Sequence, residues 1–78
     1  MRVTITPTAT HTLREIGTPE RPRYEWMVTF QVDSDEGIST AFSVPVTADT
    51  LVQAQAQGLT KAQRFLAAAS NVAQKYQL

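Results

Sequence analysis

Two segments that alternate apolar and polar residues, joined by an acidic turn, constrain the fold of this 78-residue chain more than any other feature. Residues 24–32 and 38–46 repeat with a period of two, which is typical of strands that bury one face. A type I turn at Asp35 and Glu36, followed by a positive φ at Gly37, would close a hairpin between them. This loop predicts the pairs Val32–Thr40, Phe30–Phe42, Val28–Val44 and Trp26–Val46. A slip of one residue would turn these side chains to opposite faces, so the pattern specifies the register.

The residues before the hairpin predict a third strand. Residues 2–16 begin with the same alternation, and we expect a strand that bends at Pro7, because proline removes a backbone donor from the ladder. Residues 17–23 contain one glycine and two prolines, which indicates a stiff loop leading into the hairpin. The three strands would form an antiparallel meander.

Two helices are predicted after the hairpin. Thr47 or Asp49 would cap the first helix, which would end at Gly58. Thr60 would cap the second, with Gln63 completing a capping box. The second helix carries an apolar stripe expected to pack on the sheet, made of Ala62, Phe65, Leu66, Ala69, Val72, Ala73 and Tyr76. The predicted fold is a single α+β domain over residues 1–78, with strands within 2–46 and two helices within 48–77 on one face of the sheet (βββαα).

Composition narrows the function classes. Seven basic and seven acidic side chains give no net charge, which disfavours a protein that holds nucleic acid mainly through its phosphates. The chain has no cysteine and no apolar run near the roughly 20 residues that span a bilayer. Residues 1–7 alternate and lack a signal-peptide core. We therefore expect a cytoplasmic protein with no membrane partner.

No residue pattern indicates catalysis, a cofactor or a metal. His11 is the only histidine, and no serine lies in a nucleophile motif. The acidic turn lacks the later carboxylate of a calcium loop, and the isolated glycines do not form a phosphate loop. Acidic residues also suit tight turns for local hydrogen-bonding reasons. The sequence predicts a protein that is not an enzyme.

The hairpin face opposite the core is the candidate binding surface. Between Glu25 and Asp33 it carries no charge, which suits docking to a flat protein partner, although a Thr/Ser-rich exposed sheet is the alternative interpretation. Its residues are Met27, Thr29, Gln31, Ser39, Ala41, Ser43 and Pro45. Asp35 and Glu36 at the tip, with Arg21 and Arg23 in the first loop, would orient the partner. Interleaved glutamates allow a second interpretation of these arginines, as a solvated rim.

The leading hypothesis is a non-enzymatic protein-binding module that acts sterically, as a homodimer or docked on a larger protein. One concrete form is a small inhibitor or adaptor encoded by a phage or mobile element. The first alternative is a nucleic-acid binder that uses residues 49–76 as a helix–turn–helix-like pair, with Lys61, Arg64 and Lys75 as contacts. The second is a structural subunit of a larger assembly.

Overall fold

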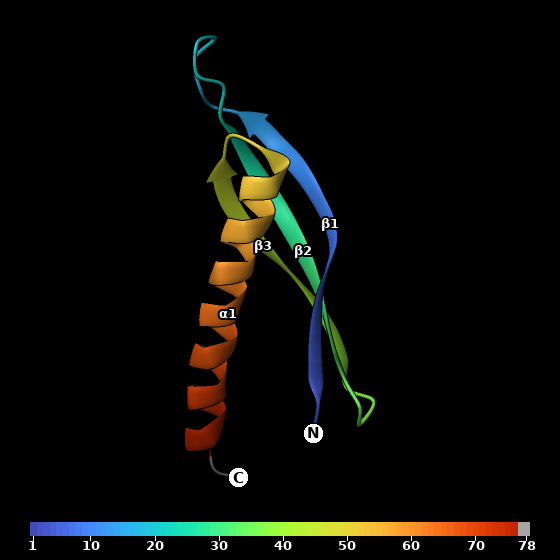
Figure 1. The fold of residues 1–78 in the computed structure, drawn as a ribbon. Helices are drawn as coiled ribbons and strands as arrows, with labels where there is room; N and C mark the ends of the chain where they lie inside the picture. Colours follow the sequence, from blue (N-terminus) through green and yellow to red (C-terminus); the bar gives the residue numbers. More distant parts are fainter. Residues whose placement is uncertain (77–78) are drawn as a thin grey trace.

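A computed structural model describes residues 1–76 and has three strands followed by one long helix (Figure 1). The strands are β1 (Val3–Glu15), β2 (Tyr24–Ser34) and β3 (Ser39–Ala48), and the helix is α1 (Leu51–Lys75). The strands form one antiparallel sheet in the order β1-β2-β3, so the predicted meander is confirmed. The fold is α+β with βββα order. It has one long helix where the sequence predicted two.

The β2–β3 hairpin has the predicted register. Val32 pairs with Thr40, and the same alignment continues through the pairs Phe30–Phe42, Val28–Val44 and Trp26–Val46. Gly37 has φ +84°, the left-handed conformation that the turn requires. The Ser34 hydroxyl accepts hydrogen bonds from two backbone N–H groups of the loop, which supports the turn locally.

Strand β1 lies at an edge of the sheet and is irregular where a bend was expected. Its register with β2 shifts between Pro7 and Ala9 and again between Thr12 and Arg14. Proline has no backbone N–H to donate to the neighbouring strand, so it is tolerated on an edge strand and beside a bulge, where the regular hydrogen-bond ladder is already interrupted. Two hydrogen bonds join the residue before β1 to the hairpin tip. The Arg2 N–H donates to the Asp35 carboxylate, and the Asp35 N–H donates to the Arg2 carbonyl, both at 3.0 Å.

The prediction of two helices is wrong, because α1 continues through Gly58 and Thr60. Gly58 does not end a helix; a Cβ there would lie 3.0 Å from Val28 Cβ, so glycine allows the helix backbone to approach the sheet closely. The Thr60 hydroxyl donates to the Ala56 carbonyl within the helix, and the expected capping box does not form. The N-cap is Thr50, whose hydroxyl accepts from the Gln53 N–H, rather than Thr47 or Asp49.

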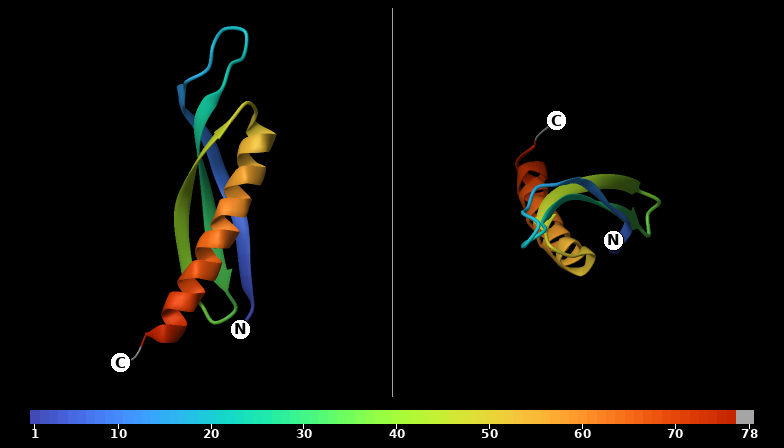
Figure 2. Two further views of the ribbon diagram at one scale, coloured as in Figure 1. Left: turned by 90° about the vertical axis from the view of Figure 1, so that its left-hand side faces the viewer. Right: turned by 90° about the horizontal axis from the view of Figure 1, so that it is seen from above.

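The helix crosses the sheet diagonally from β1 to β3 (Figure 2). Gln55 donates to Thr10 on β1, Gly58 contacts Val28 on β2, and Lys61 donates to the Pro45 carbonyl on β3. Within two turns the helix has therefore crossed all three strands. The remaining turns of α1 extend past the β3 edge.

The core lies under the first half of the helix. The fully buried residues of α1 are the small ones, Ala54, Gly58 and Ala62, and they pack on a row of larger sheet residues. The sheet residues of this core are Trp26, Val28, Phe30, Val44, Val46 and Ala48. The indole N–H of Trp26 donates to the Ala48 carbonyl at 3.0 Å, which satisfies the polar atom inside this core.

The second half of the apolar stripe does not pack on the sheet as expected. Phe65 is 57% exposed, Val72 69% and Tyr76 71%, because the helix reaches the edge of the sheet at Phe65 and lies beyond it from there on. The last aromatic contact with the sheet is between the Phe65 and Phe42 rings, whose centroids are 5.5 Å apart. The described chain is correspondingly elongated, with principal dimensions of 53 × 23 × 15 Å.

Candidate interaction surfaces

The face of the sheet opposite α1 is not covered by any other described element (Figure 1). The predicted binding residues come together on it as cross-strand neighbours: Met27 pairs with Pro45, Thr29 with Ser43, and Gln31 with Ala41. Ser39 pairs with Asp33 at the hairpin end of the same face. The β2 side chains are half-buried by their neighbours, whereas those of β3 are exposed.

Strand β1 extends this surface in a way that the sequence did not reveal. Thr6 pairs with Gln31, Ala9 with Thr29, and His11 with Met27. The only signal was the Thr-rich alternation of the first 13 residues, and the bulge at Pro7 and Ala9 prevents that alternation from giving a register. We call the combined surface the open face; its residues are Thr6, Ala9, His11, Met27, Thr29, Gln31, Ser39, Ala41, Ser43 and Pro45.

The polar side chains of the open face are hydrogen-bonded to one another. The Thr29 and Ser43 hydroxyls are 3.0 Å apart. The Gln31 amide donates to Ser39 at 2.6 Å and to Asp33 at 3.1 Å, and Ser39 donates to Asp33 at 2.6 Å. Because these groups already satisfy part of their hydrogen-bonding capacity, a partner could cover them without leaving them all unpaired.

The hydrogen bonds from Ser39 and Gln31 hold the pKa of Asp33 below its ordinary value. We expect Ser39→Ala to raise this pKa, since it removes the strongest donor, and NMR titration of the carboxyl carbon would measure the change. Because folding lowers the pKa of Asp33, its carboxylate stabilises the folded chain at pH values above the pKa of the unfolded chain. This contribution is lost as the pH falls through the pKa of the folded chain. An Asp33 pKa that stays low in Ser39→Ala would contradict this assignment.

Charged residues border the open face. Arg14 and Glu25 form an ion pair of 2.7 Å at one end, and the hydrogen bond between them lowers the pKa of Glu25 and raises that of Arg14. Asp33 lies at the other end. Among the described residues paired across the three strands, no Asp, Glu, Lys or Arg lies on this face between these two borders.

The residues expected to orient a partner lie at opposite ends of the molecule. Asp35 and Glu36 are at the hairpin tip, whereas Arg21 and Arg23 are in the β1–β2 loop at the far end (Figure 1). Arg23 is paired with Asp49 at 3.1 Å, and Arg21 is held in a turn by hydrogen bonds with Thr18. The acidic tip therefore borders one end of the open face, and the arginines form a separate group.

The residues of the nucleic-acid alternative lie on one helix, not on a helix–turn–helix pair. At 100° per residue, Lys61, Arg64 and Lys75 fall within an arc of about 60° along one edge of the apolar stripe. Lys61 donates to the Pro45 carbonyl at 3.0 Å, so one of the three contacts the protein itself. No second helix in residues 1–76 positions this one in a groove.

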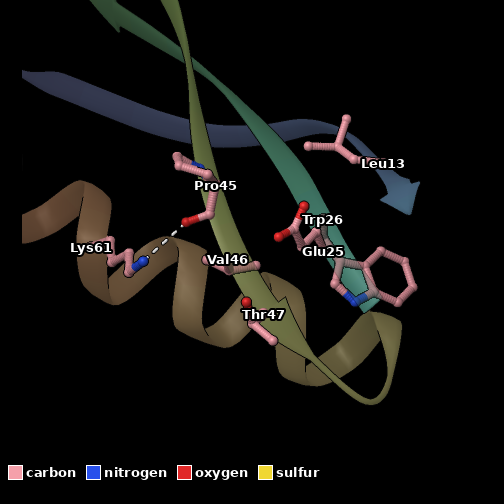
Figure 3. Close-up of a pocket in the computed structure, with 7 residues that line it drawn as sticks. All are labelled: Leu13, Glu25, Trp26, Pro45, Val46, Thr47 and Lys61. Atoms are coloured by element: carbon pink, nitrogen blue, oxygen red, sulfur yellow. Dashed lines mark hydrogen bonds between the residues drawn. The ribbon is translucent and has the colours of Figure 1, made fainter. Parts of the chain in front are cut away.

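A shallow hollow of about 290 Å³ opens at the β3 edge (Figure 3). Its charged groups are Glu25, which pairs with Arg14, and Lys61, which points to Pro45. The other lining residues are Leu13, Trp26, Val46 and Thr47. A carboxylate and an ammonium that are each already bonded leave this hollow without a free acid–base pair.

A second uncovered surface lies on the C-terminal half of α1. Small and apolar side chains line a hollow between two exposed aromatic rings. We call this surface the helix stripe; it consists of Phe65, Ala68, Ala69, Val72, Ala73 and Tyr76. Sequence reasoning found most of these residues but assigned them to the core, because an amphipathic pattern is the same whether a sheet or another molecule covers it.

Within residues 1–76, no three His, Asp or Glu side chains converge as metal ligands. None of the helical structure in that range combines the length and hydrophobicity that a bilayer crossing requires. Comparison with protein-family models, curated proteins and solved structures found no match for this chain.

Proposed function

We propose that this protein is a non-enzymatic protein-binding module that docks through its open face and acts sterically, as an inhibitor or adaptor. The observation that carries the proposal is the uncharged surface across all three strands, left bare because the helix covers only the other side of the sheet. Solvated sheet faces usually carry charge, and depletion of charge is typical of the centre of a protein interface.

The chemistry of the open face defines the partner it fits. Small side chains such as Ala41 and Ser43 leave the surface without long protruding groups, and Met27 adds an adaptable apolar contact. The acidic hairpin tip, with Asp35 and Glu36, would meet basic groups at one end of the contact. The partner is therefore a protein with a flat, uncharged patch that has basic side chains on one flank.

The double variant Thr29→Lys with Ser43→Glu is expected to abolish partner binding while leaving the fold intact. It places two charges in the middle of the open face, where a docked partner would have to desolvate them, and loss of at least about 100-fold in affinity is expected. Affinity capture from native lysate, with nuclease and at moderate salt, would compare the two proteins. The buried Trp26 provides a fluorescence check on the fold.

A matched control places the same two charges on the outer side of α1. Gln63→Lys with Ser70→Glu changes exposed helix positions about 100° or more from Ala69 at the middle of the apolar stripe, and it should bind as the unmodified chain does. A partner retained by Thr29→Lys with Ser43→Glu would exclude the open face. Captured nucleic acid that salt releases would instead support the alternative contacts Lys61, Arg64 and Lys75.

A further inference from the structure

The chain exposes more surface than a protein of its size normally does. Its accessible area is 5883 Å², whereas a compact monomer of 8.6 kDa is expected to expose about 4,700 Å². Its radius of gyration is 15.2 Å, against about 11.5 Å for 78 compact residues. The excess of about 1,200 Å² is larger than the roughly 800 Å² that each partner buries in a standard interface.

The helix stripe joins exposed apolar side chains into one continuous surface. Phe65, Val72 and Tyr76 are all more than half exposed, and the alanines between them form the floor of the hollow. The stripe continues the same helix face that is buried over the sheet, so it is a core-type surface without a partner. A contiguous apolar patch on the surface of a single chain is typical of a site that binds another protein chain.

We propose that two copies of this chain pair through the helix stripe, with their α1 helices antiparallel and crossing near Ala69, as a two-fold symmetric dimer. A two-fold axis requires a self-complementary surface. Positions equidistant from Ala69 face each other, so Phe65 lies opposite Ala73 of the second copy and Ala69 lies opposite its own equivalent. Each Phe65 ring thus meets an alanine, and small residues at the crossing let the helices approach to about 8 Å.

Charge favours this arrangement over a parallel pair. Arg64 and Lys75 lie along one edge of the helix stripe, and a parallel pair would set each beside its own copy. An antiparallel pair separates the two Lys75 side chains to opposite ends and aligns the helix dipoles favourably. The chain is also neutral overall, with residues 1–37 carrying net −2 and residues 38–78 net +2, so self-association brings no net repulsion.

The dimer uses a different surface from the open face and does not depend on the proposed function. Both open faces stay uncovered, because the helix stripe belongs to the part of the chain that extends beyond the β3 edge. A dimer would therefore present two docking faces, and it would bind a repeated or symmetric target with higher avidity than one copy does.

The test is the mass of the purified chain in solution, by light scattering and sedimentation equilibrium. The expected mass is about 17 kDa, twice that of one chain. Ala69→Glu should weaken association at least about 100-fold, because each copy would bury an unpaired carboxylate at the crossing. Ala67→Glu is the matched control: Ala67 is exposed on the same helix but about 160° away, and this variant should remain a dimer.

Three results would overturn the proposal. The first is a wild-type chain that stays monomeric at a concentration of about 100 μM, where contacts of ordinary affinity would form. The second is an equal response of Ala69→Glu and Ala67→Glu, with helicity and Trp26 fluorescence unchanged. The third is loss of the dimer in Thr29→Lys with Ser43→Glu, which would assign self-association to the open face. Retention of the dimer in that variant, together with loss of the docking partner, separates the two proposals.

Discussion

Phe30→Ala is expected to leave the chain largely unfolded. Phe30 is fully buried at the centre of the sheet, where its ring packs 5.9 Å from that of Phe42. Truncating a buried phenylalanine to alanine costs about 3–5 kcal/mol. A chain of 78 residues has a free energy of unfolding of about 4–12 kcal/mol. This elongated chain has few large buried side chains and is expected near the lower value, so the one substitution removes most or all of its stability.

Urea unfolding followed by Trp26 fluorescence and helicity would measure the effect, with the midpoint expected to fall close to zero urea. Phe65→Ala is the matched control, because it removes the same atoms from an exposed position. It removes the ring contact with Phe42, so it should lower the stability of the monomer by about 1–2 kcal/mol, less than Phe30→Ala does, and it should also weaken association. An unfolding midpoint for Phe30→Ala that is close to the wild-type value would show that the core is not where the structure places it.

The vulnerability of this core follows from the path of the helix. In the described part of the chain, Phe30 and Val28 are the largest side chains that are fully buried, and both belong to the sheet. The buried residues of α1 are alanines and a glycine, so the helix adds no large side chain to the core. Small residues bring the helix close to the sheet but bury little apolar area of their own. The chain therefore depends on a few sheet residues, and a second copy on the helix stripe would add stability in proportion to its binding.

The hairpin was predictable from sequence because every local signal agrees there. The alternation of residues 24–32 and 38–46 fixes which side chains share a face, and the turn that ends in Gly37 fixes the loop length. From these two facts the open face follows for β2 and β3. The contribution of β1 could not be derived, since the bulge after Pro7 changes which residues lie on each face.

The helix shows why the rest could not be predicted. Gly58 followed by Thr60 matches the end of one helix and the cap of another, and nothing local distinguishes this from a glycine kept for packing. The distinction depends on Val28, thirty residues earlier, whose side chain occupies the space a Cβ would need. Likewise, the pattern gives the helix stripe but not its partner, because the stripe extends beyond the β3 edge after Phe65.

Gly58→Leu is accordingly expected to destabilise the fold by about 3 kcal/mol or more. The Val28 Cβ and Cγ2 atoms lie 3.0 Å from where a Cβ at position 58 would be, and Cγ1 lies 3.2 Å away. Overpacking typically costs about 1–3 kcal/mol. A Cβ alone is already crowded in this contact, and leucine adds three further carbon atoms, so the helix would have to lift from the central strand and the cost is expected at or above the upper end of that range. Thermal unfolding followed by helicity would measure the loss.

A double-mutant cycle identifies the cause. In the wild-type chain, Gly58→Ala should be close to neutral, because the gain in helix propensity of about 1 kcal/mol is offset by crowding against Val28. In a Val28→Ala background both Cγ atoms are gone and only the Cβ at 3.0 Å remains, so the crowding is reduced. The same Gly58→Ala should then be more favourable than in the wild-type chain by up to about 1 kcal/mol, a coupling that contact between the two positions produces. If Gly58 instead ended a helix in a left-handed turn, Gly58→Ala would destabilise both backgrounds equally. Equal destabilisation in both backgrounds would therefore favour two helices that meet at Gly58 over the continuous α1, and the helix–turn–helix interpretation would again be open.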